Sequence, residues 1–166
     1  FSGGYDVNQD TNSTSEDDSI GNAIYMVDAS TGDLLWTASK DSANLNITDM
    51  KNSIPASISA VDITGDHHVN YLFAADTAGR VFRIDIKPDN SGASDFAQGG
   101  MIANIGDNTE SGNRRFFNKP NVSLIKDKQV GDYLTIAIGS GYRAHPLDAR
   151  VRDRFYMIKD FNPYGA

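Results

Sequence analysis

One short stretch of the chain, residues 62–70, carries oxygen-bearing side chains at regular intervals. Side-chain oxygens stand at loop positions 1, 3, 5 and 9, which are Asp62, Thr64, Asp66 and Asn70. Position 7, His68, would offer its backbone carbonyl. Calcium takes about six to eight oxygen ligands, and alternate residues of a tight loop can converge on one ion. The spacing therefore predicts a calcium loop with these five residues as candidate ligands.

The same loop departs from the usual calcium pattern at three positions. Thr64 stands where Asp or Asn is common, Asn70 stands where Asp is common, and His67 stands where Gly usually makes the sharp turn. Fewer anionic ligands should weaken calcium binding, and a residue other than Gly in the turn adds strain. A polar hairpin loop that has lost the metal is the alternative interpretation. A transition-metal site would need more convergent His or carboxylate side chains than the sequence offers.

Two longer loops carry opposite charge. Residues 6–21 also have a calcium-like spacing, but Gly is missing at its sixth position, so we interpret this stretch as a solvated acidic loop; its spaced residues are Asp6, Asn8, Asp10, Asn12, Thr14 and Asp17. Residues 139–152 contain three Arg and one His against a single acid, Asp148. Polar loops are usually solvated surface, although binding residues are also common on loops. His145 has no nucleophile motif beside it, so no catalytic residue is predicted.

The elements that must position these loops have the signature of strands. The apolar runs are short, rich in β-branched and aromatic residues, and bounded by Gly, Asn, Asp and Pro. The runs predict strands over 1–5, 23–28, 34–38, 55–61, 71–75, 80–86, 120–126, 133–138 and 153–159. Residues 41–51 could hold a short helical turn, and residues 87–118 are interpreted as one long connection.

Pairs of strands recur along the chain, with loops of unequal length between them. This pattern is typical of a β-propeller or another stacked-sheet array. A four-stranded blade takes roughly 40–50 residues. We therefore predict an all-β fold, part of a β-propeller, with two to three four-stranded antiparallel blades and long loop insertions. Such a piece cannot close a common ring, so either further blades complete it or the strands form an open array.

Composition narrows the class of function. A net charge of −7 argues against a nucleic-acid partner, because phosphate contacts need clustered Lys and Arg. The chain has no Cys, which excludes disulfides and thiol catalysis. No run approaches the roughly 20 apolar residues of a membrane span. Because the first residue is Phe1 and no leader pattern precedes it, we expect a piece of a longer chain or a processed product.

Several ordered motifs resemble a known family. Residues 21–36 resemble the blade motif of quinoprotein-like propellers, in which an Asp, a Thr-Gly turn and a Trp recur. Other segments resemble the C-terminal propeller of the type IV pilus tip-associated adhesins, the PilY1/PilC family. They are Gly3 to Asp6 with Asn8 to Asp10, Ser53 to Ala56, Asp62 to Asn70 followed by Asp76 to Arg83, Arg114 to Phe117, and Gly139 to Pro146 with Asp153 to Tyr156. The resemblance covers nearly all of the chain, in order.

The resemblance implies a non-enzymatic protein of the cell surface of a Gram-negative bacterium. In that family residues 62–70 correspond to the calcium loop, and residues 1–166 would be a fragment of the C-terminal propeller domain. The propeller would regulate pilus extension and retraction, twitching motility and surface adhesion. Its partners would be minor pilins, the pilus tip complex, a host or surface receptor and the rest of its own propeller. Its location would be extracellular, at the pilus tip, after export through the periplasm and outer membrane.

A second function class remains open at this point. The segment Asp28 to Trp36 also fits the propeller of a dehydrogenase that depends on pyrroloquinoline quinone. Against it, the chain has only one Trp and no Cys, although a vicinal disulfide is common in those enzymes. Fold analogy alone does not establish catalysis.

Overall fold

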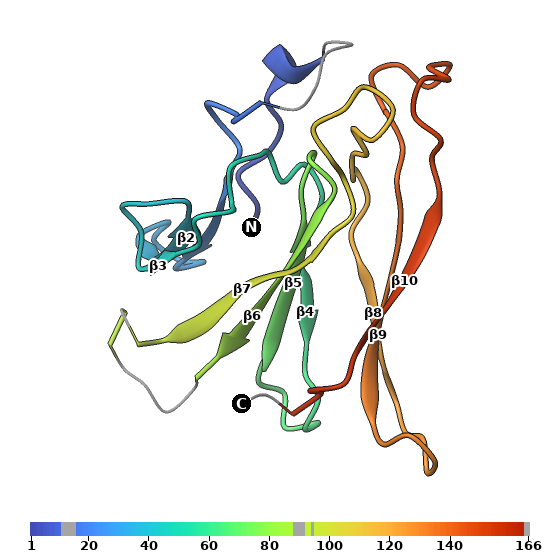
Figure 1. Ribbon diagram of the computed structural model, residues 1–166. Helices are drawn as coiled ribbons and strands as arrows, with labels where there is room; N and C mark the ends of the chain where they lie inside the picture. Colours follow the sequence, from blue (N-terminus) through green and yellow to red (C-terminus); the bar gives the residue numbers. More distant parts are fainter. Residues whose placement is uncertain (11–15, 88–91, 94, 165–166) are drawn as a thin grey trace.

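A computed structural model describes residues 1–10, 16–87, 92–93 and 95–164 (Figure 1). These residues form an all-β fold in which the only helical element is the 3₁₀ turn η1 (Val7–Gln9). The strands are β1 (Ala23–Val27), β2 (Leu34–Ser39), β3 (Leu45–Asn46), β4 (Ser59–Val61), β5 (Tyr71–Ala75), β6 (Arg80–Ile86), β7 (Ala97–Asn104), β8 (Asn121–Ile125), β9 (Tyr133–Gly139) and β10 (Phe155–Asp160). The predicted all-β class is confirmed.

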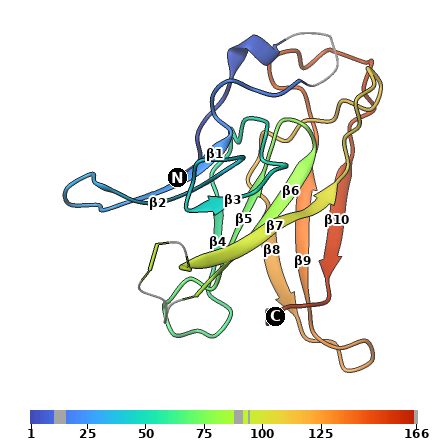
Figure 2. The same cartoon turned by 60° about the vertical axis from the view of Figure 1, so that its left-hand side comes forward.

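The strands make three small sheets that follow one another along the chain. The first sheet has the order β1-β2-β3, the second β4-β5-β6-β7, and the third β8-β9-β10. The second and third sheets are antiparallel meanders, whereas β3 runs parallel to β2. Figures 1 and 2 show the three sheets one beside the next, with the second in the middle.

Two hydrophobic cores separate the sheets. The first core lies between the first and second sheets and includes Trp36, Ala74 and Phe82. The second core lies between the second and third sheets and includes Phe73 and Val81. Successive side chains of a strand point to opposite faces, so neighbours along β5 and β6 enter different cores. β5 and β6, the two central strands of the middle sheet, are therefore buried on both faces, which explains the continuous apolar run of β5.

A buried arginine joins the second and third sheets. Arg83 on β6 is only 6% exposed. Its guanidinium lies 2.7 Å from Asp85, 2.5 Å from Asp160 on β10, and 4.2 Å from the centre of the Tyr71 ring. Because a buried charge is costly unless it is paired and hydrogen-bonded, these contacts fix how the two sheets meet.

Three predictions about the strands are wrong. Residues 1–5 form only an isolated bridge, from Ser2 to Ile24, because Gly3 and Gly4 offer no side chains to pack. Residues 41–51 hold no helical turn but the short strand β3. Only the second sheet has four antiparallel strands in the described part of the chain, so the predicted four-stranded blade applies to that sheet alone.

The predicted long connection 87–118 is also wrong, because it contains β7. The Gly99-Gly100 pair resembles a turn in sequence. In the structure Gly99 lies against the backbone of β6, where a Cβ would sit 2.2 Å from the carbonyl oxygen of Arg83. Glycine here allows two strands to approach closely near a bulge between Val81 and Phe82.

The loops divide between the two ends of the sheets. Loop 62–70 lies at the same end of the sheets as the turn 126–132 (Figure 1). The described parts of the acidic loop, residues 6–21, and the basic loop, residues 139–152, lie at the other end. Tyr5, which precedes the acidic loop, packs its ring edge-on against Phe117, with the ring centres 5.2 Å apart. The structure thus brings the acidic and basic loops to one end and keeps the candidate calcium loop away from them.

Candidate calcium loop

Loop 62–70 connects β4 to β5 and is exposed to solvent over most of its length. Two backbone hydrogen bonds join the C-terminal end of the loop, at Asn70, to the second sheet. The N–H of Asn70 donates to the carbonyl of Val61 at 2.9 Å, and the N–H of Ile86 donates to the carbonyl of Asn70 at 2.8 Å. The strands of a buried sheet therefore fix where the loop begins and ends.

Asp62 organises the first half of the loop. Its Oδ1 accepts hydrogen bonds from the N–H groups of Thr64 at 3.1 Å and Gly65 at 2.7 Å, and its Oδ2 accepts one from His67 at 2.8 Å. The Gly65 hydrogen bond is the largest cause that lowers the pKa of Asp62 below its ordinary value. The carboxylate is therefore ionised at neutral pH and already aimed into the loop.

Asn70 closes the loop from its far end. Its Oδ1 accepts a hydrogen bond from the N–H of Ile63 at 2.7 Å. The hydroxyl of Thr64 lies 3.5 Å from this oxygen and 3.2 Å from Oδ1 of Asp62. Two of the predicted ligand side chains, those of Asp62 and Asn70, thus lie around the hydroxyl group of a third, Thr64.

Asp66 and His68 form the tip. Oδ1 of Asp66 accepts a hydrogen bond from the N–H of His68 at 2.9 Å, and this bond is the largest cause that lowers the pKa of Asp66. The Thr64 side chain lowers the same pKa further. The backbone turns through positive φ values at Gly65 (78°) and His67 (68°). The sharp turn expected at position 67 is therefore present. His67 makes it in a left-handed backbone conformation that is sterically unfavourable for a residue with a Cβ and that Gly adopts without strain.

The oxygens of this loop suit calcium by chemistry. Carboxylate, amide and hydroxyl oxygens are its usual ligands, and Asp62, Thr64, Asp66 and Asn70 supply them. In the part of the chain that the structure describes, no group of three or more His, Asp or Glu side chains is placed to hold a metal. A bound calcium ion would take its ligands from the carboxylates of Asp62 and Asp66, the side-chain oxygens of Asn70 and Thr64, and water. These bonds to the ion would replace some of the hydrogen bonds that now close the loop. All five predicted ligands, the carbonyl of His68 included, stay predictions.

In the described part of the second calcium-like stretch, the side-chain oxygens do not converge on one point. Asp6 is buried, and its carboxylate accepts hydrogen bonds at 3.0 Å from the N–H groups of Asn8 and Ser19. Asp17 instead forms an ion pair with Lys40 at 2.9 Å. Asn12 and Thr14 lie outside the described residues. The loop is thus not uniformly solvated, because two of its acids, Asp6 and Asp18, are buried in the protein.

Two further buried acids were missed by the sequence patterns. Asp18, which is 5% exposed, accepts a hydrogen bond from the N–H of Ser53 at 2.5 Å, and Asp76 at the end of β5 is fully buried. Oδ1 of Asp18 and Oδ2 of Asp76 have no hydrogen-bond partner among the described residues, although Nη1 of Arg80 lies 3.6 Å from Asp76. Burial raises both pKa values, that of Asp76 to about 7. The signal available in sequence was the turn Asp76 to Gly79, which ends a buried strand.

Comparisons with protein-family models, with curated proteins and with solved structures found no match to this chain. Among the residues that the structure describes, no helix is long and apolar enough to cross a membrane.

Proposed function

We propose that this chain is part of the C-terminal β-propeller of a non-enzymatic type IV pilus tip protein, and that loop 62–70 is its regulatory calcium site. The propeller would act at the cell surface, at the pilus tip. It would contact minor pilins and a host or surface receptor, and it would influence extension, retraction and twitching. Support comes from the ordered sequence motifs together with the sheet architecture.

The observation that carries the proposal is the arrangement of the middle sheet. A four-stranded antiparallel meander with a core on each face is what a propeller blade requires. The third sheet repeats the same order of strands, and β4 lies near β8 as neighbouring inner strands of a ring would. On the outer face of the third sheet, Phe155 is 70% exposed and Met157 is 63% exposed. Further blades would cover these side chains.

The quinoprotein alternative gains no support from the position of Trp36. This side chain is only 2% exposed and packs against Phe96 in the first core, with the ring centres 5.8 Å apart. An indole that already fills an intersheet core is occupied by packing. The Thr-Gly turn and the Trp therefore serve the fold here.

Calcium titration by calorimetry tests the site. We expect a one-site isotherm for the wild-type chain and none for the double variant Asp62→Ala, Asp66→Ala, because both carboxylates are then gone. Asp127→Ala is a matched control. Asp127 makes a similar exposed turn, accepting from Gln129 N–H at 2.7 Å, at the same end of the sheets. Its variant should bind calcium like the wild type.

The outcomes separate the two parts of the proposal. No calcium heat in a folded wild-type chain would mean that the changes at Thr64, His67 and Asn70 have abolished the site. Calcium binding that the double variant loses, with unchanged piliation and twitching in the bacterium that makes the protein, would overturn the regulatory role while keeping the ion. Circular dichroism should show that every variant stays folded.

A further inference from the structure

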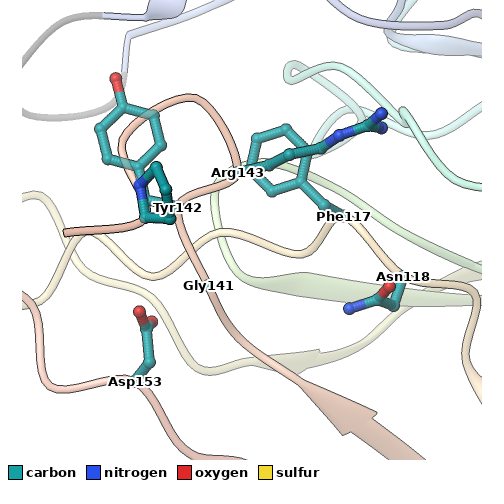
Figure 3. Close-up of a pocket in the computed structure, with 7 residues that line it drawn as sticks. Phe117, Asn118, Gly141, Tyr142, Arg143 and Asp153 are labelled. Carbon is teal, nitrogen blue, oxygen red and sulfur yellow. The ribbon is translucent and has the colours of Figure 1, made fainter. Parts of the chain in front are cut away.

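A cleft of about 360 Å³ opens at the end of the third sheet, where β9 runs into the basic loop. It lies at the end opposite the candidate calcium loop. The residues that define it come from two connections, residues 117–118 and residues 141–153. Figure 3 shows them around the backbone at Gly141; they are Phe117, Asn118, Gly141, Tyr142, Arg143, Pro146 and Asp153.

The Tyr142 side of the cleft is held in place by packing against Arg115 and His145. The Tyr142 side chain is largely buried, with the Arg115 guanidinium 3.7 Å from its ring centre and the His145 ring 4.8 Å away. The N–H of Gly141 donates to the carbonyl of Arg115 at 3.0 Å. Arg115 is itself buried, so the stacked pair fixes this part of the loop. The cleft is therefore formed before any ligand arrives, which lowers the cost of binding.

The polar groups of the cleft are of three kinds. Arg143 can only donate hydrogen bonds, an ionised Asp153 can only accept them, and Asn118 can do both. Oδ1 of Asp153 accepts from the hydroxyl of Ser140 at 2.9 Å, which leaves Oδ2 directed to other partners. No ion pair between Arg143 and Asp153 occurs in the described part of the chain, although both side chains line the cleft.

This combination selects the chemistry of a ligand. A simple anion would be repelled by Asp153, a simple cation by Arg143, and an apolar molecule would desolvate both charges without compensation. Neighbouring hydroxyl groups donate and accept at once, so they can satisfy both side chains. The C–H faces of a pyranose ring can pack on Phe117, which is partly exposed. We propose that this cleft binds a neutral pyranose unit of a saccharide.

The proposal rests on the proposed adhesive function for its biological meaning, because an adhesin needs a target. Its physical basis is the cleft alone and does not involve the calcium loop. The volume is at the small end of ligand pockets, so it fits about one sugar unit. Contacts with a single small, exposed unit give a Kd of about millimolar order, and repeated sites on a pilus would add avidity.

Gly141 provides a sharp test. A Cβ at this position would meet no atom within 4 Å, and its φ lies outside the positive region, so a larger side chain would extend into the cleft without straining the fold. Gly100 on β7 has the same two properties but lies on the second sheet, away from the cleft. Gly141→Leu is therefore the blocking variant and Gly100→Leu its matched control.

The experiment follows the backbone amide resonances of the full chain by NMR. The probes are the methyl pyranosides of glucose, galactose, mannose and N-acetylglucosamine, each at about 50 mM, well above the Kd expected for such a site. We expect at least one pyranoside to shift the amides of Gly141 and its neighbours. Gly141→Leu should weaken that binding by about tenfold or more, whereas Gly100→Leu should leave it unchanged.

Two results would overturn the proposal. The first is no shift with any of these pyranosides, and shifts with an unstructured polar peptide in that case would assign the cleft to a peptide. The second is sugar binding that survives Gly141→Leu. Repeating the titration with the Asp62→Ala, Asp66→Ala double variant separates the sites. Sugar binding there should be unchanged, so failure of the calcium proposal would not be mistaken for failure of this one.

Discussion

Asp76→Asn is expected to raise the free energy of unfolding at pH 8 by up to about 4 kcal/mol. Asp76 is fully buried at the end of β5, and burial raises its pKa from 3.8 to about 7. At pH 8 the wild-type protein must therefore hold a charged carboxylate away from water. Asn carries no charge, and its oxygen can still accept from the N–H groups of Ala78 and Arg80, which lie 3.0 Å and 2.9 Å from Oδ1 of Asp76.

The pH dependence follows from the direction of this pKa. The folded state binds its proton more tightly than the unfolded state, so the contribution of Asp76 to stability is fully present below about pH 4. It is lost as the pH rises through about 7. Burial raises the pKa of Asp18 in the same direction, and the charge of Arg80 opposes the effect at Asp76. The advantage of Asp76→Asn should therefore be small at pH 4 and large at pH 8.

Urea denaturation of both proteins at several pH values measures the difference. Asp28→Asn is the matched control, because Asp28 is also at the start of a turn, where it accepts from the N–H of Ser30 at 2.8 Å. Asp28 is only partly buried, and the Ser30 side chain lowers its pKa. Its variant should not gain stability at pH 8. Parallel pH curves for the wild type and Asp76→Asn would show that Asp76 is not the buried charge described above.

Phe82→Ala is expected to lower the free energy of unfolding by about 3–5 kcal/mol. Phe82 on β6 has no exposed surface and lies in the first core, so the substitution removes apolar contact and leaves a cavity. Phe73 on β5 is equally buried in the second core. Because the middle sheet is covered on both faces, Phe73→Ala should cost about the same.

Chemical denaturation of these variants tests the stacking of the sheets. Phe155→Ala serves as the control, because Phe155 is 70% exposed on the outer face of the third sheet and its loss should change stability by less than about 0.5 kcal/mol. A cost near that of the control for either Phe73→Ala or Phe82→Ala would mean that the corresponding pair of sheets does not pack in solution.

Local sequence determined several elements with little error. The strands predicted over 71–75 and 80–86 coincide with β5 and β6. Both are short runs of apolar residues separated by Asp76 to Gly79, and a buried strand bounded by turn residues is readable from neighbours in sequence. The strand predicted over 55–61 is shorter in the structure, where β4 begins at Ser59. The sequence did not predict β7, because its Gly99 looks like a turn residue. Gly is needed there because the backbone of β6 lies too close for a side chain, and this contact cannot be seen in the local sequence.

The candidate calcium loop is mostly a local feature. Its oxygens are spaced along residues 62–70, and the side-chain hydrogen bonds of Asp62 and Asn70 that shape it connect residues at most seven apart. The sequence could therefore place the loop and its candidate ligands. Whether an ion is held there depends on ligand geometry that spacing alone does not specify.

The sequence by itself determined the all-β class, the main strands and the candidate ligands, because each depends on residues close together in the chain. Only the tertiary structure decided that Asp18 is buried, since its partners Ser53 and Thr77 are 35 and 59 residues away. The same holds for Arg83, whose partner Asp160 is 77 residues away and lies on another sheet. Burial and charge pairing depend on which surfaces meet, and separate segments of a chain meet only when the sheets stack.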